Sequence, residues 1–221
     1  MPTIIGILNS KGGAGKSTLA INLAHALHQA GHSTLLIDTD PQGSASDWHD
    51  TAEDNPLALV SMPTVASLKG LPSIAGQYDF VIVDGESKQL GKLGAAIKLA
   101  DVVLIPVQPS PFDLWACNEL AETITTRQDI TDGKPLAAFV INRAVQHTKL
   151  GGEIAEALAG YGIPAFKQQI KQRQVYPRSA ADGLSVFDSG NSEAISEFRA
   201  FTRELMRFIE QEQRQVESAV I

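Results

Sequence analysis

Residues 9–18 read Asn9-Ser10-Lys11-Gly12-Gly13-Ala14-Gly15-Lys16-Ser17-Thr18 and separate two segments of different periodicity. The preceding run, residues 3–9, is almost continuously apolar, which suits a central parallel strand buried on both faces. From Ser17 to Ala30, small and apolar residues recur at helical spacing, and Gly31 is a typical helix stop. Glycines let the backbone wrap closely around an anion, and a helix N-terminus adds its dipole. We therefore predict a phosphate-binding loop between the first strand and the first helix.

Four further apolar runs, each ended by a polar or turn-forming residue, lie at residues 34–38, 80–84, 102–107 and 137–142. Helix-like segments fall between and after them, at about 88–100, 113–127 and 149–160. This alternation predicts an α/β fold in which a doubly wound, mostly parallel sheet carries helices on both faces. Such sheets bind ligands at the carboxyl ends of their strands. The polar residues expected at that edge are Lys11, Asp38, Asp84, Gln108 and Asn142.

Length and composition indicate one domain over residues 1–221, with a C-terminal helix at about 192–215 as part of it. The net charge of −7 argues against a general nucleic-acid binder, so any DNA contact would need a local basic patch. The single Cys117 excludes a disulfide framework and a Cys-ligated cluster within one chain. No run is apolar enough to cross a bilayer, and the first strand leaves no room for a signal peptide. We therefore expect a cytoplasmic protein.

The loop differs from the ordinary P-loop, Gly-x4-Gly-Lys-Ser/Thr, because Ser10 stands where a glycine is expected. It matches KGGxGK[ST], the deviant Walker A motif, which has a second lysine at Lys11. Lys16 should contact the β- and γ-phosphates, Ser17 should ligate Mg²⁺, and Thr18 is placed to contact the α-phosphate. The loop residues predicted to bind nucleotide are Lys11, Gly12, Gly13, Ala14, Gly15, Lys16, Ser17 and Thr18.

On these residues the sequence resembles the ParA/MinD superfamily of deviant Walker A ATPases, and the resemblance covers nearly the whole chain. Residues 36–43 (Leu-Ile-Asp-Thr-Asp-Pro-Gln-Gly), 83–85 (Val-Asp-Gly) and 106–111 (Pro-Val-Gln-Pro-Ser-Pro) also carry it. The best match is to the small plasmid-type ParA proteins, including the ParF-like group. Their Gln-Arg-x-x-Tyr stretch has a counterpart in residues 172–176, which are followed by Gly-Leu-Ser-Val-Phe at 183–187.

The resemblance implies that Lys11 crosses a dimer interface to the ATP of the partner subunit, so that ATP joins two subunits face to face. It implies catalytic roles for Lys11, Lys16 and Asp40, with Asp40 positioning the attacking water. Asp84 matches the Walker B carboxylate that holds Mg²⁺ together with Ser17, and Asp38 should lie near the metal. Asn142, followed by Arg143, resembles the adenine-contacting position. Glu86 departs from the pattern of many relatives, which have Asp-Thr/Ser-Pro after this strand.

The function that the resemblance implies is a Mg-ATP-dependent dimerising ATPase, slow alone and stimulated by a partner. It would partition or position plasmid or chromosomal DNA, with a centromere-binding (ParB-type) adaptor and association with the nucleoid. A positioning ATPase for a non-DNA cargo, such as a chemoreceptor cluster or a microcompartment, is the alternative, and the sequence does not discriminate between the two. A metabolic P-loop enzyme of the dethiobiotin-synthetase type is less favoured, because such enzymes generally lack a lysine at the place of Lys11.

Two basic segments are candidates for non-specific DNA binding in the ATP state. Residues 157–181 contain no Asp or Glu, and the last helix has a basic stripe at i, i+4 and i+8 beside its apolar face. The candidate residues are Lys167, Lys171, Arg173, Arg178, Arg199, Arg203 and Arg207. The alternative is a solvated basic flank that pairs with neighbouring acids. The acidic residues from Glu210 onward disfavour an anionic membrane surface, so no membrane partner is expected.

Overall fold

The computed structural model describes residues 1–85, 89–145, 154 and 156–219. Within this part, seven strands form one sheet in the order β3-β2-β4-β1-β5-β6-β7, and all neighbouring strands are parallel. The strands are β1 (Thr3–Ile7), β2 (Thr34–Asp38), β3 (Ala58–Ser61), β4 (Phe80–Asp84), β5 (Val102–Val107), β6 (Leu136–Ala144) and β7 (Ile170–Lys171). The predicted α/β fold with a parallel sheet is confirmed.

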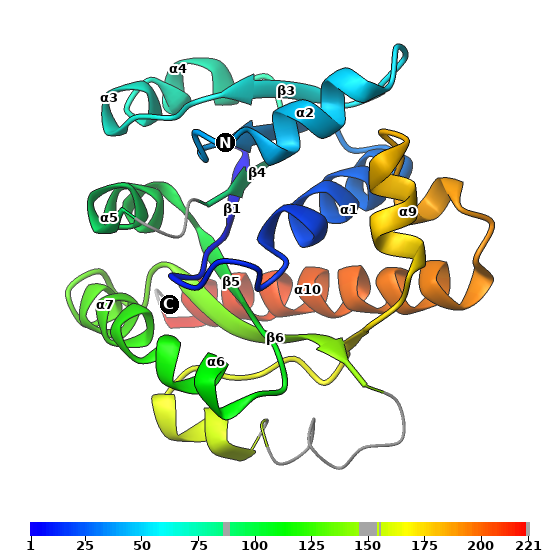
Figure 1. Cartoon of the computed structure of the whole chain (residues 1–221). Helices are drawn as coiled ribbons and strands as arrows, with labels where there is room; N and C mark the ends of the chain where they lie inside the picture. Colours follow the sequence, from blue (N-terminus) through cyan, green and yellow to red (C-terminus); the bar gives the residue numbers. More distant parts are fainter. Residues whose placement is uncertain (86–88, 146–153, 155, 220–221) are drawn as a thin grey trace.

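Helices cover both faces of this sheet (Figure 1). They are α1 (Lys16–Gln29), α2 (Ser44–Thr51), α3 (Val65–Leu68), α4 (Leu71–Ala75), α5 (Leu90–Leu99), α6 (Pro111–Ala116), α7 (Asn118–Asp129), α9 (Val175–Ala181) and α10 (Ser192–Ala219). Two 3₁₀ turns, η1 (Ala159–Tyr161) and η2 (Val186–Asp188), complete the described elements. In Figure 1, α5 and α7 lie to the left of the strands, whereas α1 and α9 lie to the right.

The alternation of side chains along each strand creates two hydrophobic clusters, one on each face. Leu36 belongs to the cluster that contains residues of α1, α2, α9 and α10. Its neighbours Leu35 and Ile37 belong to the other cluster, with residues of α3, α4, α5 and α7. The central strands are apolar throughout because both of their faces are covered. Helix α10 contributes Phe198 and Phe201, both fully buried, to the cluster that contains α1.

Several elements differ from the sequence prediction. The short strands β3 and β7 and the helices α2, α3, α4 and α9 were not predicted. The segment predicted as one helix at 113–127 is two helices, α6 and α7, which Cys117 separates. Asn142 lies within β6 and not at its end. Of the helix predicted at about 149–160, Ile154 and residues 156–158 are helical, whereas 149–153 and 155 lie outside the described residues.

The strand register places the predicted polar residues at one edge of the sheet. β1 lies between β4 and β5, with Ile7 paired to Asp84, and Asp84 is in turn paired to Asp38 of β2. The loop that follows β1 therefore emerges directly beside two buried aspartates. This edge is the carboxyl end of the strands, where open α/β sheets bind their ligands.

Candidate nucleotide site

The phosphate loop is held in its shape by two left-handed glycines and one side chain. Gly13 and Gly15 have φ angles of 78° and 90°, which strongly favour glycine. A Cβ added to Gly15 would lie 2.2 Å from Nδ2 of Asn142. That Asn142 nitrogen donates a hydrogen bond of 2.8 Å to the carbonyl oxygen of Ala14. Asn142 of β6 therefore supports the loop that follows β1.

A second set of contacts ties the loop to the β5–α6 connection. Nδ2 of Asn9 donates to the carbonyl oxygen of Pro106 at 2.7 Å, and the Ser10 hydroxyl donates to that of Ala116 at 2.8 Å. The side-chain amide of Gln108 donates to the carbonyl oxygen of Gly13 at 2.8 Å. Ser10, which stands in place of the usual glycine, thus has a structural role as an anchor to α6.

Lys16 and Asp84 are two buried charged residues below the loop. Nζ of Lys16, a residue with 8% exposure, donates to the carbonyl oxygen of Lys11 at 3.3 Å. Burial lowers the pKa of Lys16, and the carboxylates of Asp84 and Asp40 oppose that shift. Among the described residues, neither carboxylate oxygen of Asp84 has a hydrogen-bond partner of standard geometry. Burial raises the pKa of Asp84 to about 7; the Ser17 hydroxyl beside it lowers the pKa, and Asp38 raises it further.

Asp38 organises the turn that follows β2. Its Oδ1 accepts a hydrogen bond of 3.0 Å from the amide of Asp40, and its Oδ2 accepts hydrogen bonds from the amide and hydroxyl of Ser46 at 2.9 and 2.8 Å. Asp40 in turn accepts a hydrogen bond of 2.9 Å from the amide of Gln42 and remains half-buried at the edge of the groove. Both oxygens of Asp38 therefore accept hydrogen bonds from the protein, whereas those of Asp84 have no hydrogen bond of standard geometry within the described residues. The metal-ligand roles of both aspartates remain predictions.

Lys11 makes a contact that the sequence did not suggest. Its Nζ pairs with Oδ2 of Asp113 in α6 at 2.5 Å, and the Asp113 side chain is only 3% exposed. The backbone amide of Lys11 donates to Oδ1 of Asn9 at 2.8 Å. In the single chain, therefore, the second lysine of the loop is directed to α6. Its predicted role in the active site of a partner subunit remains a prediction.

Two neighbouring hollows flank the loop. A groove of about 690 Å³ is lined by the loop residues Gly12, Gly13 and 15–18 together with Asp40, Trp48 and Leu184. A second hollow of about 540 Å³ is lined by Asn142, Lys171, Tyr176 and Pro177, among others. Thr18 and Arg143 line both hollows, so they mark the passage between them.

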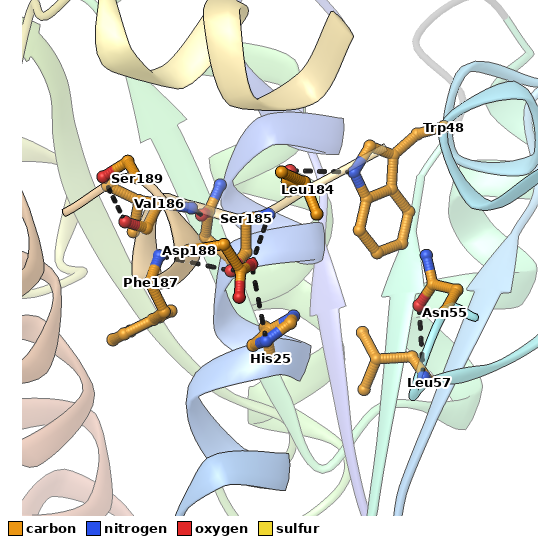
Figure 2. A network of polar contacts seen from close by, with 11 residues as sticks. His25, Trp48, Asn55, Leu57, Leu184, Ser185, Val186, Phe187, Asp188 and Ser189 are labelled. Carbon is orange, nitrogen blue, oxygen red and sulfur yellow. Dashed lines mark hydrogen bonds and ion pairs between the residues drawn. The ribbon is translucent and has the colours of Figure 1, made fainter. Parts of the chain in front are cut away.

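The far wall of the groove joins distant parts of the chain (Figure 2). Nε1 of Trp48 in α2 donates to the carbonyl oxygen of Leu184 at 3.0 Å. Leu184 follows Gly183, whose φ is 68° and whose added Cβ would lie 2.6 Å from the amide nitrogen of Ala52. Glycine at 183 thus allows the segment to approach α2 closely enough for the tryptophan contact.

The same C-terminal segment is fastened to α1 directly behind the phosphate loop. Oδ1 of Asn22 accepts a hydrogen bond of 2.7 Å from the amide of Val186. Ser185 and Asp188 form a capping box on η2. Oδ2 of Asp188 also lies 3.7 Å from Nε2 of His25, a contact that Figure 2 shows. Burial lowers the pKa of His25, which Asp188 partly offsets. The groove wall is therefore anchored on the helix that begins at the loop.

The residues at this edge fit a nucleoside triphosphate with Mg²⁺. Lys16 and the loop amides suit phosphate oxygens, and the buried carboxylate of Asp84 beside the Ser17 hydroxyl supplies oxygen ligands. The described residues contain no group of three or more His, Cys, Asp or Glu that could hold a metal ion. Mg²⁺ is commonly held by one or two protein oxygens together with substrate phosphates and water.

Comparison with known families decides the assignment. The family described as the CobQ/CobB/MinD/ParA nucleotide binding domain matches residues 5–186. The chain belongs to this family. The resemblance to the ParA/MinD superfamily is confirmed, and the nucleotide site described above lies inside the matched region.

Two relatives of this CobQ/CobB/MinD/ParA-family chain are named for the maintenance of carboxysome distribution. It is 33% identical over 223 residues to "Maintenance of carboxysome distribution protein A" of Gloeobacter kilaueensis, with 93% of the chain and 95% of the relative covered. The protein of the same name from Halothiobacillus neapolitanus is 30% identical over 190 residues, covering 84% and 87%. Apo McdA from Cyanothece shares the fold, with a TM-score of 0.78, 18% identity and coverage of 93% and 100%.

In this ParA/MinD-family chain, one basic candidate of the first segment is paired with acids that lie on another element. Although residues 157–181 contain no acids, the glutamates of α10 lie against part of that segment. Glu204 accepts hydrogen bonds from the amides of Lys167 and Gln168, both at 2.8 Å. Arg173 pairs with Glu193 at 2.9 Å and with the buried Glu197 at 3.4 Å. Arg173 is therefore paired with acids, as the alternative of a basic flank describes, because tertiary packing supplies the carboxylates. Its DNA contact remains a prediction.

The other candidates remain at the surface. Arg199, Arg203 and Arg207 are exposed, and all three line a groove of about 560 Å³ between α10 and the end of α1. Lys167 lines a neighbouring hollow with Arg203 and Arg207. Lys171 lies instead beside the hollow that contains Asn142, and Arg178 is exposed on α9 and donates to Gln174. Their DNA contacts remain predictions.

Sequence reasoning missed the residues that support the site from other elements. Asp113, Trp48 and Asn22 act through tertiary contacts, and a single sequence gives no signal for such pairs. Glu86 lies outside the described residues. In the described part of the chain, no helix combines the length and apolar composition that a membrane crossing requires.

Proposed function

We propose that this chain is an ATP-driven positioning switch whose cargo is a protein assembly of the carboxysome kind. The nucleotide is ATP, and the metal is Mg²⁺. Two copies associate when ATP is bound and separate after hydrolysis, because ATP favours the dimer-competent state more than ADP does. The observation that supports the ATPase cycle is the loop itself, with Lys16 buried at its floor and Lys11 extending from its rim.

Each part of the site has a role in this proposal. Lys16 binds the phosphates, and Ser17 and Asp84 hold the metal, which neutralises charge on the phosphate oxygens. Asp40, which lines the groove together with the phosphate loop residues, orients the water that attacks the phosphate. Asn142 and Arg143 border the hollow for the base. Lys11 contributes its charge to the nucleotide of the other subunit, as an arginine finger does in related chemistry.

The cargo assignment follows from the relatives. Two proteins named for maintaining carboxysome distribution match this chain over most of its length. They favour a protein assembly over plasmid or chromosomal DNA as the cargo. A partner protein that is bound to the assembly, and not a centromere-binding protein, would then stimulate hydrolysis. DNA partition is the competing outcome, because the family also includes ParA.

Non-specific DNA serves in this proposal as the surface on which the ATP-bound dimer is held, which places the protein in the cytoplasm on the nucleoid. The arginine stripe of α10 is the favoured contact, because Arg199, Arg203 and Arg207 are exposed and share one groove. Dimerisation doubles the stripe and offsets the net charge of −7 locally. Affinity should fall steeply with salt, and Arg203→Ala should weaken binding whereas Arg127→Ala on α7 should not.

The ATPase cycle is tested by sedimentation velocity with ADP and with a slowly hydrolysed ATP analogue, together with hydrolysis rates. We expect the wild type to be a dimer with the ATP analogue but not with ADP. We expect Lys11→Ala to bind ATP but to lose ATP hydrolysis. Unchanged hydrolysis in this variant would refute the role of Lys11. Activity that requires a small carboxylic acid but no protein or DNA would identify a metabolic enzyme instead.

The cargo is tested in the source cell. Deletion of the gene should cluster the protein assembly that it distributes, while plasmid and chromosome loss rates stay unchanged. Asp40→Ala, which retains the loop, should reproduce the deletion if hydrolysis drives distribution. Increased plasmid loss with a normally distributed assembly would favour DNA partition.

A further inference from the structure

Asp113 is a buried carboxylate that the proposed cycle does not use. It lies in the first turn of α6, and its side chain is 3% exposed. Oδ2 contacts Nζ of Lys11, whereas Oδ1 is buried without a hydrogen-bond partner among the described residues. A buried carboxylate requires a nearby cation or a full set of hydrogen bonds. In the described part of the chain, the one ion pair that Asp113 forms is with Lys11. Lys11 therefore supplies the cation that the buried carboxylate needs.

The two partners differ in their freedom to move. Asp113 is held through the backbone of α6, where the Cys117 thiol donates to its carbonyl oxygen at 3.2 Å. The same helix is tied to the loop by the Ser10 hydroxyl. The Lys11 side chain, by contrast, is 35% exposed and long. Release of the pair therefore means that Lys11 leaves while Asp113 stays.

We propose that Asp113 is a positioning residue that retains Lys11 within its own subunit and so sets the threshold for ATP-dependent dimerisation. This inference rests on the proposed function of Lys11 in the partner's active site. When Lys11 moves to the partner's nucleotide, Asp113 is left buried without its cation, and this cost opposes dimer formation. A single subunit is thus kept from presenting a free ammonium group until a second nucleotide-loaded copy competes for it.

The test is a double-mutant cycle on the full chain with Asp113→Asn and Lys11→Ala. Dimer dissociation constants are measured by sedimentation with a slowly hydrolysed ATP analogue and with ADP. Asp113→Asn should tighten the analogue-bound dimer by about tenfold, because the competing carboxylate charge is removed. In the Lys11→Ala background the same substitution should change the dissociation constant by less than about twofold.

The controls separate this inference from its premise. Asp101→Asn removes one charge at the opposite edge of the sheet and should leave dimerisation unchanged. If thermal unfolding shows that Asp113→Asn does not fold, Asp113→Ser takes its place in the cycle. If the wild type shows no nucleotide-dependent dimer, the proposed function fails, and the inference falls with it. If the wild type dimerises but Asp113→Asn does not tighten the dimer, or tightens it equally without Lys11, only the role of Asp113 is overturned.

Discussion

The side-chain nitrogen of Asn142 donates a hydrogen bond of 2.8 Å to the carbonyl oxygen of Ala14, joining β6 to the phosphate loop across 128 positions of sequence. The same nitrogen occupies the space that a side chain at Gly15 would need. The loop is therefore constrained from outside as well as by its own glycines. Its shape is set before any ligand arrives, which reduces the ordering cost of binding.

This constraint predicts that Gly15→Ala abolishes tight nucleotide binding. The added methyl group would lie 2.2 Å from Nδ2 of Asn142, and φ of 90° is unfavourable for alanine. Affinity for a fluorescent ATP analogue should fall by at least about tenfold. Gly31→Ala is the matched control, since Gly31 has φ of 93° but no atom within 4 Å of the added Cβ. That variant should lose about 1 kcal/mol of stability and keep its affinity. Equal affinities for the two variants would contradict the prediction.

Asp84→Asn should stabilise the ligand-free protein, and the gain should grow with pH. The pKa of Asp84 is raised by burial from 3.8 to about 7, so the folded state binds the proton more tightly than the unfolded state. The contribution of Asp84 to the free energy of unfolding of the wild type therefore falls as pH rises from about 4 to 7. The asparagine variant has no group that titrates here, so its free energy of unfolding does not show this decrease. Between pH 5 and pH 8 its advantage should increase by about 3 kcal/mol in urea unfolding.

Two further measurements test the prediction for Asp84→Asn. Asp129→Asn, at the exposed end of α7, controls for the loss of one negative charge. Added Mg²⁺ and nucleotide should stabilise the wild type more than Asp84→Asn, because the carboxylate then has a cation partner. A constant difference in stability between Asp84→Asn and wild type at all pH values would show that the Asp84 carboxylate is not desolvated.

The pairing of Arg173 predicts that Glu197 supports stability. Glu197 accepts hydrogen bonds from the amide of Lys171 at 3.0 Å, from Arg173 at 3.4 Å and from the Tyr176 hydroxyl at 3.4 Å. Its side chain is 6% exposed, so Glu197→Gln leaves Arg173 partly unpaired in a buried setting. The loss should be about 2–4 kcal/mol in the free energy of unfolding. Glu193→Gln, whose side chain is 74% exposed, should cost less than about 1 kcal/mol. Similar losses for both would refute the assignment.

Cys117 should be unreactive in the native protein. It is fully buried between α6 and α7, and burial raises the pKa of its thiol to about 12. At pH 8 the thiolate fraction is about one in ten thousand, so alkylation should be slower than for a free thiol by several orders of magnitude. Asn9→Ala should slow the reaction further, because the contact with Nδ2 of Asn9 lowers the pKa of the Cys117 thiol and its loss reduces the thiolate fraction. Rapid native labelling would show that α6 detaches from the loop.

The sequence was most informative where a strand is buried on both faces. The runs at 34–38, 80–84 and 102–107 match β2, β4 and β5 because a fully covered strand must be apolar throughout. Strand β3 was missed because its four residues are exposed or half-buried at the sheet edge. Strand β7 has only two residues. Segments this short cannot be distinguished from loops by periodicity alone.

For the site, the loop motif identified where phosphate should bind, but not what holds the loop. Asn142 was assigned to the adenine and is found bonded to Ala14. Arg173 was assigned to DNA and is found paired with Glu197. In both cases the partner lies on another element, and only the tertiary structure brings the two together. Local spacing identifies which side chains can act, whereas their partners depend on packing.

The hydrogen bond between Trp48 and Leu184 has a consequence for synthesis of the protein on the ribosome. The loop and Trp48 emerge early, but the wall that closes their groove arrives only with residues 180–184. A nascent chain that has not yet released this segment has the phosphate loop without this wall. We therefore expect a chain that ends before residue 180 to bind nucleotide more weakly than the full chain.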